Sequence, residues 1–170
     1  MPYWELFYHI VWSTKNRLPL LTPDIEQAVY GFLRAKAVGL HANVFALNGV
    51  ADHVHLVASI PPGIALAKFI GQVKAVAATR INKSGLSATP LYWQEEYSVF
   101  SFDRKRLPNF IAYVERQKSH HGQRTTIPVL ERTESADFML VEEPASIYAV
   151  EDDAWRREME SVHSRIHPAQ

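Results

Sequence analysis

The chain has 170 residues, of which 47% are hydrophobic and 21% charged, a composition typical of one globular domain and not of a disordered or fibrous protein. It contains no cysteine, which excludes disulfides, thiolate nucleophiles and cysteine-based zinc sites. The net charge of zero hides a division, because up to Leu130 there are 14 Lys and Arg against 8 Asp and Glu, and from Glu131 on 4 against 10. The basic part is suited to a polyanionic partner.

The first half of the chain predicts a strand, a helix and a hairpin. Residues 3–12 are rich in aromatic and β-branched side chains, as strands are. A helix follows, with Pro23 at its first position and Gly39 as its stop. Two short apolar runs, 43–50 and 53–60, are separated by only two residues, which predicts an antiparallel pair with a tight connection.

The second half predicts a helix, a strand and a third helix. The first helix runs from about Ile64 to Lys83, with an apolar side and with lysines and arginines on its wetter faces. A strand near 97–102 and a helix from Leu107 to about His121 follow. The order β, α, β, β, α, β, α predicts an α+β fold of the ferredoxin-like kind. This is a split β-α-β antiparallel sheet with helices on one face, to which a C-terminal tyrosine-bearing helix is added.

We expect residues 1–126 to form one domain and residues 127–170 to form an acidic extension that is no independent domain. Residues 152–165 of this extension could form one amphipathic helix. The N-terminus lacks the basic start and long apolar run of a signal peptide, and no segment approaches 18 uninterrupted apolar residues. A cytoplasmic protein without a membrane partner is therefore expected.

Two histidines alternate on the second strand of the predicted hairpin. Because successive side chains of a strand point to opposite faces, His53 and His55 face the same way, with Cα atoms about 6.5 to 7 Å apart. Two imidazoles can converge on one cation from there. The eight histidines of the chain would produce an H-x-H roughly 0.4 times by chance, and histidines at a sheet surface often only satisfy hydrogen bonds. The motif therefore needs context.

The third predicted helix carries Tyr113 and Gln117 one turn apart, so both side chains lie on one face at the edge of its apolar stripe. Three basic or potentially basic side chains, Arg106, His120 and Arg124, project near the same stripe. A tyrosine at such an edge often does no more than cap a core. This pair too gains its meaning from its neighbours.

Joined, the two motifs define a chemistry. Two imidazoles and an amide oxygen can hold Mg²⁺ or Mn²⁺, which withdraws charge from a phosphate oxygen while the phenol attacks phosphorus. A free phenol, with a pKa of about 10, is a poor nucleophile at neutral pH and depends on such activation. The resulting phosphotyrosine conserves the ester bond, so rejoining needs no ATP or other nucleotide cofactor.

Four blocks in order along the chain carry a family resemblance: YHIVWSTKNRLPLL, GVADHVHLVASIPP, YWQEEYSVFSF and YVERQKSHH. Over roughly Tyr3 to Arg124 the chain resembles the single-tyrosine HUH transposases of small bacterial insertion sequences, including their REP-associated relatives. Four ordered blocks are far more specific than either short motif. The likeness ends near Thr126, where an acidic tail replaces the usual short ending.

The resemblance implies a transposase, an enzyme that nicks and joins DNA by transesterification. It implies that His53 and His55 are paired metal ligands and that Gln117 is the third. It also implies that Tyr113 is the nucleophile, which forms a 5′-phosphotyrosine with single-stranded DNA and leaves a free 3′-hydroxyl. The partners it implies are a DNA hairpin at an element end, Mg²⁺ or Mn²⁺, and a second copy of the chain, because many members are homodimers.

Basic side chains near the predicted site are candidates for phosphate contacts. They are Lys15, Arg17, Lys68, Lys74, Arg80, Arg104, Lys105, Arg106 and Arg124. Tyr92, Trp93 and Phe100 could stack on unpaired bases, although core packing is the commoner duty of such residues. Each charge taken alone is as well explained by solvation of the surface.

Two other functions fit parts of the sequence. A non-catalytic module that binds single-stranded DNA or RNA could use a ferredoxin-like sheet with an aromatic face, and would bind without cutting. A metal-dependent phosphoesterase acting on small molecules would release its product without a covalent protein intermediate. The placement of Tyr113 four residues before Gln117 argues against the phosphoesterase.

Overall fold

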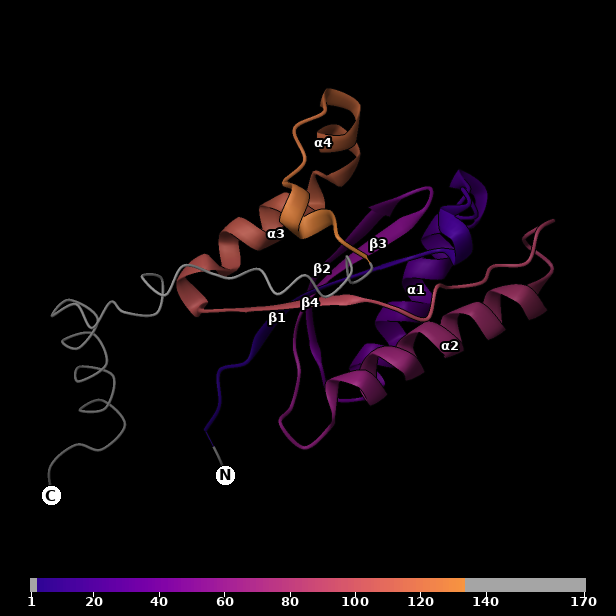
Figure 1. Cartoon of the computed structure of the whole chain (residues 1–170). Coiled ribbons are helices and arrows are strands. Elements are labelled where there is room, and N and C mark those ends of the chain that lie inside the picture. Colours follow the sequence, from indigo (N-terminus) through magenta and orange to yellow (C-terminus); the bar gives the residue numbers. More distant parts are fainter. Residues whose placement is uncertain (1–2, 134–170) are drawn as a thin grey trace, which may run out of the picture. The chain divides into compact units, whose positions relative to one another are not determined.

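The computed structural model describes residues 3–133 (Figure 1). The predicted helix at 152–165, and the acidic extension from residue 134 on, lie outside the described residues. Within the described part, no helix is both long and apolar enough to span a bilayer.

The described part is built on a four-stranded sheet in the order β2-β3-β1-β4. Its strands are β1 (Phe7–Ser13), β2 (Asn43–Val50), β3 (His53–Ser59) and β4 (Ser98–Phe102). Every neighbouring pair is antiparallel. The predicted ferredoxin-like fold is confirmed, and β3, which carries the two histidines, is a central strand with all seven residues buried.

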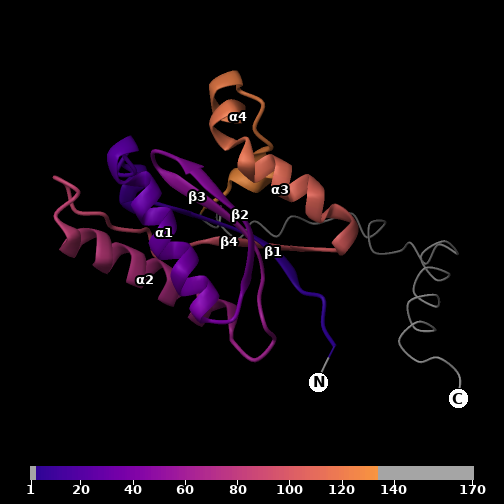
Figure 2. The ribbon, with the colours of Figure 1, turned by 180° about the vertical axis from the view of Figure 1, so that it is seen from behind.

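Two long helices cover one face of the sheet, α1 (Pro23–Gly39) and α2 (Leu66–Ser84) (Figures 1 and 2). Alternate residues of the central strands point toward these helices and form the main core. The buried side chains of that core include Ile10, Trp12, Val54, Leu56, Ala58, Ile25, Val29, Leu33, Phe69 and Val73. Gly85 caps the C-terminal end of α2 in the left-handed region, at φ 72°, close to the predicted end of this helix near Lys83.

The other face of the sheet is covered by α3 (Leu107–Glu115), as the figures show. Here Tyr113 and Val114 pack against Ala46 and Val57 in a second, smaller cluster. His9, His53 and His55 lie on this face, because they alternate with the residues of the main core. The sheet therefore presents its histidines to the tyrosine-bearing helix.

The prediction of one continuous third helix is wrong. It divides at Arg116, whose φ of −99° and ψ of 17° depart from helical values, and a short α4 (Gln117–Gln123) follows. The side-chain amide of Gln117 donates to the Tyr113 carbonyl at 3.4 Å. In an unbroken helix that carbonyl accepts from the main-chain N–H of residue 117. The side chain thus competes with the backbone at the point where the helix turns.

Three single-turn 3₁₀ segments complete the described part: η1 (Lys15–Arg17), η2 (Arg104–Arg106) and η3 (Pro128–Glu131). In η1, Asn16 and Arg17 have positive φ values of 55° and 52°. The segment η3 follows α4 and returns the chain to the sheet face that carries the histidines (Figure 1). The last described residues therefore lie close to the histidines of the sheet.

Candidate active site

The side chains of His53 and His55 are buried and lie next to each other on one face of β3. They are 1% and 0% exposed, and their ring centroids are 5.0 Å apart. The hairpin that carries them is tight at Gly49, where a Cβ would collide with the carbonyl oxygen of His53. A residue without a side chain at this position lets β2 approach β3 closely.

Each of the two rings is held through its Nδ1 atom. His53 Nδ1 lies 2.6 Å from Asp52 Oδ1, and the second Asp52 oxygen lies 3.4 Å from Arg17 Nε. His55 Nδ1 lies 2.9 Å from Nε2 of His9, a buried residue of β1. Both Nε2 atoms are thereby directed to the same place, an arrangement typical of metal-binding histidines.

The surroundings of these rings shift their pKa values in opposite directions. Burial lowers the pKa of His53, but Asp52 and Glu131 outweigh it and raise the pKa above its ordinary value. Burial lowers the pKa of His55, and burial together with His55 lowers that of His9 to about 3. The ring of His9 is therefore neutral at physiological pH and serves as a fixed partner for His55.

Tyr113 reaches this face from α3 and is 7% exposed. Its ring lies edge-on to His55, with 6.1 Å between the centroids, and stacks on His120 at 4.9 Å. The phenol donates to Glu131 and accepts from the N–H of Ile127 at 3.0 Å. Burial and the bond to Glu131 raise the pKa of Tyr113 to about 12, so the phenol holds its proton at neutral pH.

Gln117 lies at the start of α4 and is fully buried. Its amide nitrogen donates to the carbonyl of Tyr113, which ties the two residues together. Among the residues that the structure describes, its Oε1 atom has no hydrogen-bond donor. A buried amide oxygen without a partner is costly and is a suitable ligand for a hard divalent cation.

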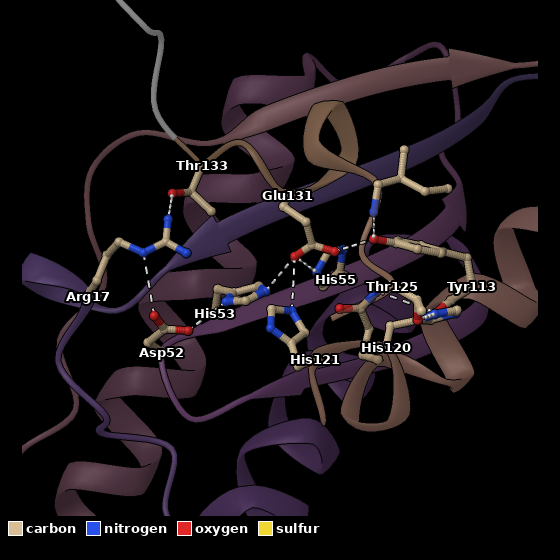
Figure 3. Close-up of polar contacts among 12 residues, drawn as sticks. Arg17, Asp52, His53, His55, Tyr113, His120, His121, Thr125, Glu131 and Thr133 are labelled. Carbon is tan, nitrogen blue, oxygen red and sulfur yellow. Dashed lines mark hydrogen bonds and ion pairs between the residues drawn. The ribbon is translucent and has the colours of Figure 1, made fainter. Parts of the chain in front are cut away.

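The sequence did not point to Glu131 or to the role of His121 at this site. One oxygen of Glu131, Oε2, lies 2.9 Å from His53 Nε2, 3.3 Å from His55 Nε2 and 3.1 Å from His121 Nε2 (Figure 3). Burial would raise the pKa of Glu131, but hydrogen bonds to His53 and His55 outweigh it and hold the pKa well below its usual range. These four side chains offer donor atoms that all lie within 4.8 Å of one another.

A signal for His121 existed, because it follows Gln117 by four residues and so shares its helical face. No comparable signal existed for Glu131, which ends the single 3₁₀ turn η3, an element too short to show a periodic pattern. The other contacts of that segment reinforce its position, since Arg17 Nη1 donates to Thr133 Oγ1 at 2.8 Å. Residues 127–133, which the sequence assigned to the extension, thus contact the site directly.

The donor set fits a divalent cation. It combines three imidazole nitrogens with a carboxylate. The described residues include no cysteine that could compete for a softer metal. The predicted requirement for a metal therefore has suitable residues at the predicted place.

The prediction that Lys74 lies on a wetter face of α2 is wrong. It is 7% exposed, and its ammonium group donates to three backbone carbonyls of residues 94, 95 and 96, at 2.5, 3.1 and 3.3 Å. Burial lowers its pKa to about 8. Lys74 therefore holds the segment before β4 onto α2, and its ammonium group has no free face for a phosphate.

The other basic candidates lie at the surface in several regions of the described part. The exposed ones are Lys15, Arg17, Lys68, Arg80, Arg104, Lys105, Arg106 and Arg124. Arg17 pairs with Asp52, and Arg104 pairs with Glu5 at 2.5 Å. Arg106 lines an open pocket of about 240 Å³ together with Phe110 and Tyr113.

The three aromatic residues that are candidates for base stacking differ in their exposure. Tyr92 is 58% exposed and is free to stack on a base. The Trp93 indole donates to the Lys74 carbonyl at 3.0 Å and its ring packs on the main core. Phe100 is half-buried, with its ring 6.2 Å from that of His9.

Comparison with known proteins adds a family to these observations. Residues 2–117 match the family described as "Transposase IS200 like". The chain is 26% identical over 120 residues to the ISDra2 transposase TnpA of Deinococcus radiodurans, which covers 67% of this chain and 85% of the relative. It is 30% identical over 71 residues to the transposase for insertion sequence element IS200 of Salmonella typhimurium, or 42% of this chain and 47% of that one.

Solved structures share the fold. A transposase-like protein of Deinococcus radiodurans superposes with a TM-score of 0.55 at 22% identity, over 69% of this chain and 95% of the other. The REP-associated tyrosine transposase bound to a REP hairpin superposes with a TM-score of 0.55 at 13% identity, over 72% and 75%. At these identities the likeness is one of fold.

Proposed function

The chain belongs to the IS200-like transposase family, and from that membership we propose that it is a metal-dependent single-stranded DNA endonuclease and strand transferase. We propose that it recognises hairpin DNA at element ends and cleaves through a 5′-phosphotyrosine. The observation that carries the proposal is the position of Tyr113, which faces His53 and His55 across one surface of the sheet. A similar fold bound to a REP hairpin supports a hairpin as the ligand.

In this proposal His53 and His55 hold the ion through their Nε2 atoms. Their Nδ1 atoms are engaged by Asp52 and His9, which leaves Nε2 as the ligand atom. The buried Oε1 of Gln117 is the third proposed ligand, and its lack of a donor among the described residues supports that role. A divalent cation, Mg²⁺ or Mn²⁺, supplies Lewis-acid polarisation of the scissile phosphate when bound there.

Tyr113 is the proposed nucleophile. Its phenol oxygen bonds to phosphorus, the bond from phosphorus to the 3′-oxygen breaks, and the leaving 3′-oxygen takes up a proton. Because the pKa of Tyr113 is raised to about 12, the phenolic proton must be removed as the attack proceeds. That proton already points to the carboxylate of Glu131, which is the proposed acceptor.

The DNA is proposed to run past the open pocket beside Tyr113, where Arg106 is a positive charge at the entrance. The remaining surface cations named above, without Lys74, are the proposed phosphate contacts. Their exposure supports this role, since counterion release requires cations that a phosphate can reach.

We also propose a homodimer in which Tyr113 acts with the histidines of its own chain. The phenol reaches its own site within one chain, beside His55, which supports action in cis. Mixing a Tyr113→Phe chain with a His53→Ala chain tests this. Nicking by the mixture would show that the tyrosine serves the partner's site, and light scattering reports the oligomeric state.

The decisive test of the function is a covalent adduct. The full chain is incubated with labelled single-stranded hairpins from its own genomic flanks, with and without Mn²⁺, and the products are separated under denaturing conditions. We expect a metal-dependent protein–DNA adduct that Tyr113→Phe abolishes while hairpin binding is retained. Tyr3→Phe is the matched control, because Tyr3 is exposed and has no proposed role in binding or catalysis.

An adduct that persists in Tyr113→Phe would remove Tyr113 as nucleophile. Tight, salt-sensitive hairpin binding by the unmodified chain, with no scission in Mn²⁺, would instead establish the non-catalytic binding module.

A further inference from the structure

The carboxylate of Glu131 lies where three imidazoles converge. Its Oε2 atom is 2.9 to 3.3 Å from the Nε2 atoms of His53, His55 and His121 (Figure 3). The Glu131 side chain is 14% exposed, and those of His53 and His55 are 1% and 0%. Four donor groups from three separate parts of the chain thus meet at one place, which is open on the side of His121, whose side chain is 33% exposed.

One divalent cation would satisfy these donors together. Asp52 and His9 engage the Nδ1 atoms of His53 and His55, so both Nε2 atoms face the Glu131 oxygen. Among the described residues, the buried Nε2 of His55 has no hydrogen-bond partner, and a cation at this point would coordinate it together with the other three donors.

The distances suit a shared ion. Two ligand atoms bound to one metal at about 2.1 Å are about 3.0 Å apart at a right angle and about 3.4 Å apart at the tetrahedral angle. The three distances from Glu131 Oε2 to the imidazole nitrogens fall across this interval. The four donor atoms lie within 4.8 Å of one another, and an ion about 2.1 Å from each would draw the widest pair to about 4.2 Å or less.

We infer that Glu131 and His121 are ligands of the ion held by His53 and His55, so that the metal site is a four-donor site of three imidazoles and one carboxylate. This inference deepens the proposed function, because it adds two ligands to the same centre. Such a donor set selects a divalent transition metal over Mg²⁺, since imidazole suits transition metals and Mg²⁺ prefers oxygen ligands and water.

The segment that carries Glu131 is held on both sides. The N–H of Ile127 donates to the phenol of Tyr113 at 3.0 Å, and Thr133, which is 2% exposed, accepts from Arg17. Glu131 is therefore fixed in place before any ion arrives, and a prepared ligand loses less entropy on binding.

The test measures binding of the metal alone to the full chain. Mn²⁺ and Co²⁺ affinities are obtained by competition with a chromophoric chelator, and the visible absorption of bound Co²⁺ reports the ligand set. We expect Glu131→Gln and His121→Ala each to lower the affinity at least tenfold and to change the Co²⁺ spectrum. The matched control, Glu115→Gln, replaces an exposed carboxylate at the end of α3 and should bind as the unmodified chain does.

Circular dichroism and a cooperative thermal transition in the absence of metal establish that each variant is folded. Unchanged or tighter binding by folded Glu131→Gln, with an unchanged Co²⁺ spectrum, would overturn the inference and leave the carboxylate as a group that merely fills the space. The proposed function fails separately, if His53→Ala and His55→Ala bind the metal as well as the unmodified chain. Gln117→Ala in the same series shows whether the amide is a further ligand.

Discussion

His9 Nε2 on β1 lies 2.9 Å from His55 Nδ1 on the neighbouring strand β3. When a metal takes the Nε2 atom of His55, the ring's proton must reside on Nδ1, and His9 Nε2 is then the acceptor of that proton. The buried histidine of β1 thus fixes both the tautomer and the orientation of a proposed ligand. It is a positioning residue and contacts no substrate.

Replacing His9 with leucine should weaken metal binding about tenfold, because the buried Nδ1–H of His55 loses its acceptor. Chelator competition with Mn²⁺ measures this effect. His9→Gln is the informative companion, because its amide oxygen can accept the same proton, and it should recover part of the affinity. Equal affinity in all three proteins would show that the contact between the two rings plays no part in the metal site.

Replacing Gly49 with alanine should destabilise the protein by about 2 kcal/mol or more. The added Cβ collides with the carbonyl oxygen of His53, so the β2–β3 hairpin has to open. Urea denaturation measures the free energy of unfolding. Gly71→Ala is the control, since an added Cβ there meets nothing and the helix α2 should gain about 0.5 to 1 kcal/mol.

Lys74 should make stability depend on pH in the alkaline range. Its pKa is about 8 in the folded chain and about 10.4 in the unfolded chain. Below pH 8 both states hold the proton, whereas above it only the unfolded state does, so the free energy of unfolding rises with pH. Relative to Lys74→Met, the unmodified chain should gain about 1 to 2 kcal/mol between pH 8 and 9.5.

Urea denaturation at several pH values below 10 measures this difference and avoids the ionisation of tyrosines in the unfolded chain. Lys68→Met is the control, because Lys68 is exposed on the same helix and should leave the profile unchanged. A constant difference between the unmodified chain and Lys74→Met would refute the assigned pKa shift.

Replacing Arg106 with glutamine should weaken hairpin binding. It should also reduce the magnitude of the negative slope of log affinity against log salt concentration by about 1. The reason is its position at the pocket beside Tyr113, where the DNA is proposed to pass. Fluorescence anisotropy with a labelled hairpin over a series of salt concentrations gives the slope. Arg34→Gln, on α1 across the sheet, should leave it unaltered, and equal slopes for both variants would remove Arg106 from the DNA path.

The fold was largely predictable because its signals are local. The alternating apolar residues of β1 and β3, the two-residue connection after Val50 and the stop at Gly85 are each read within a few positions of the chain. The division at Arg116 was not, because the non-helical φ and ψ of one residue do not interrupt the apolar pattern. Helical periodicity carries no information on such a local departure.

The site was predicted only in part, for a related reason. His53 and His55 share a face by strand geometry alone, and Tyr113 is brought to them by the packing of one amphipathic helix. Glu131 lies 78 residues beyond His53, at the end of the single 3₁₀ turn η3, which is too short to show a periodic pattern. Lys74 reads as a solvated lysine of α2, because the three carbonyls that enclose it come from a loop.

The two oxygens of Glu131 have different partners, since Oε1 accepts from the Tyr113 phenol and Oε2 lies among the imidazoles. A change of charge or hydrogen bonding at one oxygen therefore affects the other, because both belong to one rigid carboxylate. By thermodynamic linkage, cation binding and ionisation of the phenol affect each other equally. If a bound cation lowers the pKa of the phenol, ionisation of the phenol raises the affinity for the cation by the same free energy. One carboxylate would thus couple metal binding at the proposed site and ionisation of the proposed nucleophile in a single reciprocal equilibrium.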